Sequence, residues 1–177
     1  MTRRISYALF DSPLGTLLLA HSGRGLCSIR FPAISETHLL SNLRSLLQRR
    51  FGTVELVPES SPLKEAISYL KDYFSGPATA GVFGGRLDPG GTDFQRLVWK
   101  TLLEIPAGQT LSYQDVARKL GRASACRAVG AACGANPIPI IVPCHRVVSS
   151  SGALGGFGGG LKLKRYLLQL EGWNADG

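Results

Sequence analysis

The spacing of apolar and polar positions predicts strands near the N-terminus and a helix after them. Three short apolar runs, Ile5–Phe10, Thr16–Ala20 and Leu26–Phe31, are separated by the turn-prone segments DSPLG and HSGRG. We therefore expect three strands joined by turns. From Thr37 the apolar positions recur with the period of a helix, which we expect to end near Arg50.

A strand, a helix and a last strand are predicted for the rest of the N-terminal half. Val54–Val57 has the composition of a short strand. Ser61 is the predicted N-cap of the helix that follows, with Pro62 in its first turn. The apolar segment Val82–Leu87 is the candidate for a last strand.

The segment DPGGT, residues 88–92, is the best linker in the chain. We therefore predict two domains, residues 1–88 and residues 89–177. The expected fold class is α/β in the mixed sense (α+β). The first domain is predicted to hold a mainly antiparallel sheet with helices, and the second to be helical.

The start signals of the C-terminal helices are well defined. Capping boxes begin at Thr92 (TDFQ) and at Ser112 (SYQD), and each predicts a helix. Ser124 is the predicted N-cap of a third helix, which must end by Asn136 because a residue before proline avoids helical geometry. Two short helices separated by GRAS form a helix-turn-helix arrangement, although most helical hairpins do not bind DNA.

The third helix has one face that is almost bare of side chains. Arg127, Gly130, Ala131 and Gly134 are spaced so that they share this face. Two interpretations stay open. The small residues could pack against another helix, or the helix could approach a nucleic-acid groove closely, with Arg127 inserted between bases.

Composition is that of a folded globular protein. The chain has 177 residues, of which 44% are apolar and 18% charged, and its apolar runs are far shorter than the ~18 residues of a membrane span. We expect neither an integral membrane protein nor a signal peptide. Four cysteines are too few for a disulfide scaffold, which favours a reducing, intracellular setting.

The net charge is +8, and its basic excess is larger in the C-terminal half. A polyanionic partner and a merely basic surface both agree with this charge. No two cysteines form a CxxC pair, which argues against a zinc ribbon or a thioredoxin-type motif. Cys27, His21 and His38 do not have the spacing of a zinc site, so we predict no metal.

The segment IPIIVPCHRVV carries the candidate chemistry. Cys144 directly precedes His145 and Arg146, in a region that Pro143 makes irregular. A nearby cation and an imidazole favour thiolate over thiol, and a water could bridge the two side chains. Taken alone, however, such a dipeptide is more often a buried structural cysteine beside a surface histidine.

Several further segments accompany this one in a fixed order. They are Ser112-Tyr113, Arg127-Ala128-Val129-Gly130, Asn136-Pro137, Pro143-Cys144-His145-Arg146-Val147, the glycine-rich 155–160 and Leu170-Glu171-Gly172. Together they resemble the O6-alkylguanine-DNA alkyltransferase family, for which Pro-Cys-His-Arg-Val is highly specific. The resemblance extends more loosely to the N-terminal half. It implies a ribonuclease-H-like first domain and a winged-helix, helix-turn-helix second domain.

The resemblance implies direct-reversal DNA repair. A methyl or other alkyl group would pass from O6-alkylguanine, and also from O4-alkylthymine, in duplex DNA to Cys144. By resemblance His145 is the base acting through a water, Glu171 orients its imidazole, Asn136 braces the turn and Tyr113 donates to the leaving guanine. Because a thioether is a very poor leaving group, each molecule would react once. No cofactor is expected.

The same resemblance implies how DNA is held. The damaged base would flip out through the minor groove, and Arg127 would fill the gap it leaves. The implied DNA-contacting residues are Arg127, Tyr113, Gly130, Ala131 and Ser124. The implied pocket residues are Val147, Gly158, Phe157, Pro139 and Lys164, although Lys164 in LKLKRY could equally be an ordinary exposed charge. The expected partner is double-stranded DNA, with no membrane. A DNA substrate implies a cytoplasmic location in a prokaryote or a nuclear one in a eukaryote. We expect a monomer and leave cooperative binding along DNA open.

Three other functions are weighed against this one. A lesion sensor without catalysis would keep the helix-turn-helix and Arg127 but replace the nucleophile, and Cys144 argues against it. A Cys-His hydrolase usually has a widely separated pair, which the adjacent residues here do not match. A transcription factor would place long polar side chains on its recognition helix to distinguish bases, and the Gly/Ala face cannot do so.

Overall fold

The computed structural model describes residues 2–76 and 81–173 of the chain. The described residues form two compact units, one of residues 2–75 with 81–90 and the other of residue 76 with 91–173. Each unit is described by itself below. In the part of the chain that the structure describes, no helix is long and apolar enough to cross a membrane.

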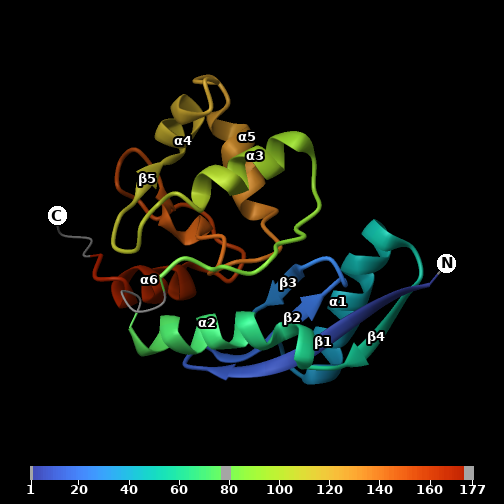
Figure 1. Ribbon diagram of the computed structural model, residues 1–177. Helices are drawn as coiled ribbons and strands as arrows, with labels where there is room; N and C mark the ends of the chain where they lie inside the picture. The colour runs from blue at the N-terminus through green and yellow to red at the C-terminus, as the bar shows by residue number, and fades with distance from the viewer. Residues whose placement is uncertain (1, 77–80, 174–177) are drawn as a thin grey trace. The chain divides into compact units, whose positions relative to one another are not determined.

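The N-terminal unit is built on a four-stranded sheet of order β3-β2-β1-β4 (Figure 1). Strand β1 pairs antiparallel with β2, and β2 pairs antiparallel with β3, which confirms the three strands expected from the apolar runs. Strand β4 lies parallel to β1. The strands are β1 Arg3–Ser12, β2 Gly15–His21, β3 Leu26–Arg30 and β4 Val54–Pro58.

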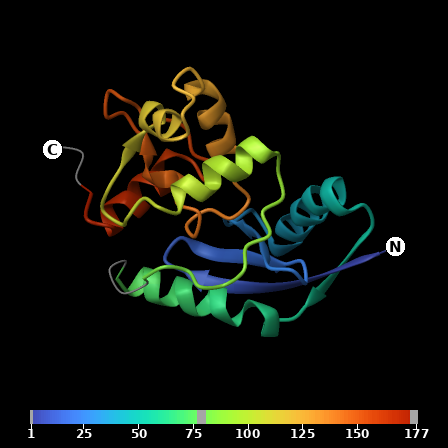
Figure 2. The same ribbon diagram turned by 45° about the horizontal axis from the view of Figure 1, so that its top comes forward.

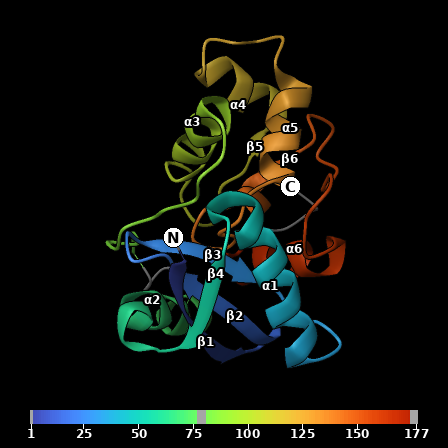
Figure 3. The same ribbon diagram turned by 90° about the vertical axis from the view of Figure 1, so that its right-hand side faces the viewer.

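Helices cover both faces of this sheet, with α1 (Glu36–Phe51) on one side and α2 (Lys64–Ser75) on the other, as Figure 3 shows. Successive strand residues point to opposite faces, so a strand covered on both sides is apolar throughout. Leu18 packs in the cluster on the α1 side, and the neighbouring Leu17 is also fully buried. On the α2 side, Phe10 of β1 stacks on a ring from α2.

Two expectations for the N-terminal unit are wrong. Val82–Leu87 is not a strand, since only a single bridge joins Leu87 to Leu26, and Val82 is 89% exposed. The two glycines inside that segment leave little side chain to pack, which weakens a strand. Ser61 is not an α-helical N-cap, because it begins a 3₁₀ turn (η1, Ser61–Leu63) and α2 follows from Lys64.

The C-terminal unit is mostly helical (Figure 2). Helices α3, α4 and α5 pack against one another, and the indole of Trp99 on α3 donates to the carbonyl of Ala132 on α5 at 2.8 Å. Two short strands, β5 and β6, pair in parallel. The elements are α3 Asp93–Leu102, β5 Leu111–Ser112, α4 Tyr113–Lys119, α5 Cys126–Gly134, the 3₁₀ turn η2 Cys144–Arg146, β6 Val147–Val148 and α6 Leu161–Leu170.

The capping signals of this unit are confirmed at two of three places. Thr92 and Ser112 form the capping boxes of α3 and α4. Ser124 does not cap α5, whose N-cap is Ala125 with no side-chain hydrogen bond. The backbone N–H of Ala125 instead donates to the Arg122 carbonyl at 2.8 Å, so the turn between α4 and α5 runs one residue further than expected. Helix α5 ends before Asn136, as predicted.

A half-buried ion pair between Arg50 and Asp88 holds the end of the N-terminal unit in place. The carboxylate of Asp88 accepts hydrogen bonds from Ser22 and from the guanidinium of Arg50. Burial by itself raises the pKa of Asp88, but the bonds from Ser22 and Arg50 outweigh it and hold the pKa below its usual value. The ionised form of Asp88 therefore stabilises the fold.

Asp88→Asn should lower the free energy of unfolding by about 1–3 kcal/mol, because it leaves Arg50 without its charged partner. A depressed carboxyl pKa stabilises the fold above the unfolded-state value of about 3.9, and this contribution is lost as the pH falls through the folded-state value. Urea unfolding of wild type and variant at neutral and acidic pH measures both effects. Glu55→Gln, at an exposed position on β4, is the control. A difference that does not shrink on acidification would contradict the assignment.

Candidate active site

The segment that carries Cys144 is a tight, buried turn. The backbone N–H of Val142 donates to the Ile138 carbonyl at 2.9 Å. Between them, Ile140 has a φ of +74°, the only positive φ of a non-glycine residue in residues 2–76 and 81–173. A β-branched residue adopts this geometry only under constraint from its surroundings. The turn therefore fixes the position of Cys144, which follows it after Pro143.

Asn136 holds this turn at both ends. Its amide nitrogen donates to the Val142 carbonyl at 2.8 Å and to Cys144 Sγ at 3.1 Å. Its amide oxygen accepts from the Ile138 N–H at 3.0 Å. One side chain thus fixes the turn and contacts the candidate nucleophile.

Burial keeps Cys144 in its thiol form at rest. The residue is 6% exposed, and burial raises its pKa, while the hydrogen bond from Asn136 and the charge of Lys164 oppose that rise. Since a thiolate is the nucleophilic form, the cysteine needs a base in order to react.

The buried carboxylate of Glu171 lies beside His145, the residue that follows Cys144. Glu171 Oε1 lies 2.8 Å from His145 Nε2. Arg146 Nε donates to Glu171 Oε2 at 2.8 Å, and its Nη2 donates to Oε1 at 2.8 Å, which makes the pair bidentate. The Arg146 guanidinium also donates to the Ile105 carbonyl. Sequence reasoning gave Arg146 no such role, although its place in the PCHRV motif was a signal.

These contacts fix the charge states of the pair. Burial acts to raise the pKa of Glu171, but His145 and Arg146 lower it to about 2. Burial lowers the pKa of His145 despite the opposing effect of Glu171. At neutral pH the site therefore holds a carboxylate and a neutral imidazole. With Nε2–H donating to Glu171, the basic lone pair of that imidazole is on Nδ1.

Tyr113 reaches the same region through strand pairing. Ser112 pairs with Val148 in the β5–β6 ladder, so the start of α4 lies beside the segment that follows Cys144. Gly155 has a φ of +66°, and a Cβ there would lie 2.6 Å from the Tyr113 hydroxyl, so a side chain at this position would displace the tyrosine. Burial, followed by the nearby thiols, raises the pKa of Tyr113. Tyr113 is therefore a protonated hydroxyl at neutral pH.

Lys164 is a buried residue rather than an exposed charge. It is 0% exposed, and Nζ donates to the Val147 carbonyl at 2.6 Å and to the Leu154 carbonyl. Burial lowers its pKa. The ammonium thus links the strand after the cysteine to the start of the glycine-rich segment.

The remaining predicted pocket residues occupy the same unit. Phe157 meets the His145 ring edge-on with centroids 6.5 Å apart. Val147 and Pro139 are buried, and Gly158 is exposed with no atom within 4 Å of the place where a Cβ would stand. Gly158 therefore leaves open space on the wall that it forms.

Most of the bare face of α5 lies at the surface. Arg127, Ala131 and Gly134 are exposed, as is Ser124 before the helix. A Cβ at Gly130 would lie 3.8 Å from the Tyr113 ring, so the middle of the face borders the candidate active site. Of the two interpretations left open above, this exposure favours a surface that meets a partner.

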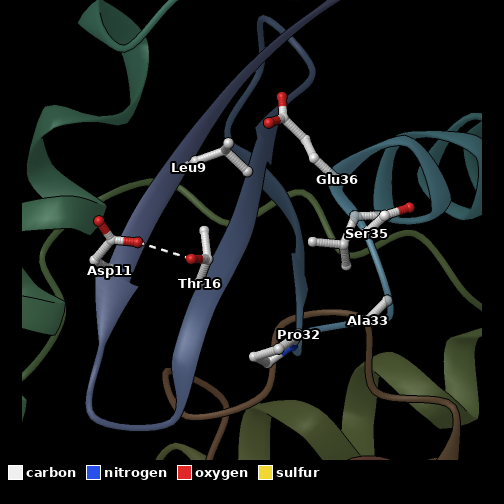
Figure 4. Close-up of a pocket in the computed structure, with 8 residues that line it drawn as sticks. Leu9, Asp11, Thr16, Pro32, Ala33, Ser35 and Glu36 are labelled. Carbon is white, nitrogen blue, oxygen red and sulfur yellow. Dashed lines mark hydrogen bonds between the residues drawn. The ribbon is translucent and has the colours of Figure 1, made fainter.

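Other features lie outside this site. A pocket of about 350 Å³ in the N-terminal unit contains none of the predicted site residues (Figure 4). Its lining residues are Leu9, Asp11, Thr16, Pro32, Ala33, Ser35, Glu36 and Leu39. Within the described ranges, no three His, Cys, Asp or Glu side chains are grouped so as to hold a metal ion. The absence of a metal stays a prediction.

Comparisons with known proteins identify the family. The DNA-binding domain of 6-O-methylguanine DNA methyltransferase matches residues 93–173, and the ribonuclease-like domain of that family matches residues 5–80. The methylated-DNA–protein-cysteine methyltransferase of Mycobacterium tuberculosis is 45% identical over 168 residues, covering 94% of this chain and 92% of that protein. The protein of the same name from Methanosarcina acetivorans is 39% identical over 166 residues, covering 94% and 97%.

A solved structure gives the same result. The crystal structure of Mycobacterium tuberculosis OGT in complex with DNA has a TM-score of 0.74 and 42% identity, and the match covers 95% of this chain and 92% of that one. The fold and the site define a protein that places a buried thiol and an imidazole–carboxylate pair in a helix-turn-helix domain. The chain belongs to the 6-O-methylguanine DNA methyltransferase family. Its enzyme class is that of the methylated-DNA–protein-cysteine methyltransferases, and the expected resemblance and mixed fold class are confirmed.

Glu171→Gln should lower the free energy of unfolding by about 3–5 kcal/mol, because Arg146 then becomes a buried cation without a counter-ion. The contribution of the carboxylate is present above its unfolded-state pKa of about 4.3 and is lost as the pH falls toward the folded-state value of about 2. Urea unfolding checks both statements, with exposed Glu104→Gln as the matched control. Equal effects of the two substitutions would contradict the prediction.

Proposed function

We propose that this methyltransferase repairs O6-alkylguanine in duplex DNA by transferring the alkyl group irreversibly to Cys144 Sγ. One observation carries the proposal. Asn136 donates a hydrogen bond to the buried thiol of Cys144, and the next residue, His145, is hydrogen-bonded through Nε2 to Glu171. This is the arrangement of a nucleophile, a base and an orienting acid. O4-alkylthymine, which also carries its alkyl group on an exocyclic oxygen, is proposed as a second substrate.

The proposed step is a displacement at the alkyl carbon. The Cys144 proton passes through a water to His145, and the thiolate attacks the carbon bound to O6. A sulfur–carbon bond forms while the carbon–oxygen bond breaks, and its electron pair goes to the guanine. Tyr113, whose raised pKa keeps it protonated, donates to the leaving guanine, because an unprotonated guanine anion leaves less readily. The products are a neutral guanine, a thioether, an imidazolium on His145 and a phenolate on Tyr113, and transfer of the imidazolium proton to the phenolate restores both side chains.

The buried setting of the thiol explains why the base is needed. A high cysteine pKa leaves little thiolate at neutral pH. His145 is neutral in this setting and can accept the proton, and Glu171 stabilises the imidazolium that forms. Asn136 donates to Sγ and stabilises the developing thiolate.

Backbone groups of the same segment suit the recognition of a guanine. The Val147 carbonyl accepts from Lys164 with one lone pair, and a carbonyl has a second one for an exocyclic amine. Lys164 also binds the Leu154 carbonyl, so it holds the start of the glycine-rich segment next to the Val147 carbonyl. We propose that Phe157, Gly158 and Pro139 line the rest of the pocket.

The α5 surface suits the approach to DNA. A base within the stack cannot be reached, so the damaged nucleotide must be flipped out. We propose that the exposed small residues Ala131 and Gly134 let α5 lie close to the minor groove, with Gly130 beside the pocket, and that Arg127 fills the gap in the duplex. Ser124 stands at the same end of the helix, where a hydroxyl can bind a phosphate.

Intact mass should establish the transfer. After incubation with a duplex that contains one O6-methylguanine, the protein should gain the mass of one CH₂ group at Cys144. The gain should reach one equivalent and stop, because a thioether has no route back to a thiol here. Peptide mapping locates the modified residue.

Two variants control this experiment. Cys144→Ser should show no gain, and Cys126→Ser, which removes a partly exposed thiol from α5, should show the full gain. An unmodified wild type that still binds the lesion tightly would support the sensing function instead. An unmodified protein that does not bind the lesion would refute the proposed function altogether.

Arg127→Ala should slow transfer from duplex DNA by roughly ten- to hundredfold, because extruding a base costs a few kcal/mol and the variant no longer fills the gap that the base leaves. It should leave the reaction with the free base O6-benzylguanine unchanged, because no base has to be extruded there. Single-turnover rates on both substrates check this, with the exposed Arg165→Ala on α6 as the matched charge control. If both substrates slow equally, Arg127 does not act through the duplex.

A further inference from the structure

The turn that joins α3 to β5 closes around the buried carboxylate. Within it, the Ile105 carbonyl accepts a hydrogen bond from the Arg146 guanidinium. Three residues later, the Gly108 N–H donates to Glu171 Oε2 at 3.4 Å. The turn Ile105–Gly108 therefore contacts both charged partners of the ion pair, although it carries no charged side chain.

Gly108 fits this place only because it lacks a side chain. Its φ is +79°, in the region that favours glycine, and a Cβ would lie 2.9 Å from the Glu171 backbone oxygen. Real Cβ atoms essentially never approach a backbone atom so closely. The turn and the residue that bears the carboxylate are thus in direct contact along their backbones.

Glu171 has little freedom to move away from that contact. It is the C-cap of α6, and its N–H donates to the Leu167 and Leu168 carbonyls at 3.1 Å each. Beyond it the Trp173 N–H returns to the Leu168 carbonyl at 2.9 Å. A side chain at position 108 would therefore displace the Glu171 carbonyl, the turn, or both.

We propose that the turn Ile105–Gly108 is a positioning element for alkyl transfer, and that the close approach of Gly108 sets the place of the Glu171 carboxylate against His145. This inference rests on the proposed function. Gly108 is a positioning residue in this scheme, since it acts through Glu171 and not on the substrate.

The charges around His145 give the expected consequence. Besides its burial, the imidazole faces Glu171, which raises its pKa, and Arg146 and Lys164, which lower it. If Glu171 shifts away, burial and the two cations remain. The imidazole then accepts the Cys144 proton less readily. The transfer rate should therefore fall most at the pH values where the thiolate forms only by proton transfer to His145.

The decisive variant is Gly108→Ala in the full chain. We expect single-turnover methyl transfer from an O6-methylguanine duplex to slow at least tenfold near neutral pH. The deficit should shrink as the pH rises, because direct ionisation of the Cys144 thiol then begins to replace proton transfer to His145. The imidazole proton resonance of His145, recorded below the melting temperature of the variant, should shift away from its wild-type position.

Two further variants separate the close approach from backbone strain. Gly108→Asn keeps the added Cβ but tolerates a positive φ better than alanine, and it should be slow as well. Gly23→Ala imposes a similar φ, +83°, at a position with no atom within 4 Å, and it should react at the wild-type rate.

Several outcomes would overturn the proposal. These are a wild-type rate for Gly108→Ala, a loss that is equal at every pH, recovery of the rate in Gly108→Asn, and failure of Gly108→Ala to fold. The last would make Gly108 a requirement for folding rather than for positioning. Absence of transfer in the wild type would refute the proposed function instead, so the two failures are distinguishable.

Discussion

The buried carboxylate of Glu171 is the constraint on which the candidate site depends. An ion removed from water is unfavourable unless it is paired and fully hydrogen-bonded. Glu171 is paired with Arg146 and bound to His145, and the Gly108 N–H contributes a further contact. These groups come from the end of α6, from η2 and from the α3–β5 turn. The charge therefore joins three separate segments in one place, and the geometry next to Cys144 follows from their meeting.

Further hydrogen bonds hold the parts of the site that the ion pair does not reach. Asn136 spans the turn before Cys144 and bonds to Sγ, so the thiol is placed by an amide rather than by a charge. The β5–β6 pairing brings Tyr113 beside the segment that follows Cys144, and Lys164 binds the Val147 and Leu154 carbonyls. The strand pairing and the Lys164 bonds join residues that are ten or more positions apart in the chain. A single displaced segment would therefore change the site at several atoms.

The sequence alone predicts the features that depend on residues only a few positions apart. The capping boxes at Thr92 and Ser112 each satisfy helix N–H groups within four residues, and both are present. Ser61 and Ser124 were assigned wrongly, because a 3₁₀ turn and a longer interhelical turn replace a side-chain cap. The burial of Lys164 depends on carbonyls 10 and 17 residues away, and LKLKRY contains no sign of them. The role of each site residue came from the motif resemblance and not from periodicity.

A buried thiol beside a neutral imidazole has a consequence for a protein that reacts once. An exposed thiolate would be open to oxidation and to stray electrophiles, because the ionised form is the reactive one. Here burial keeps Cys144 as a thiol, and its pKa lies above the ordinary value. In the proposed reaction, an alkylated guanine occupies the pocket and the Cys144 thiolate forms when its proton passes to His145. The same burial that makes the resting cysteine unreactive thus makes the Glu171–His145 geometry necessary for its single turnover.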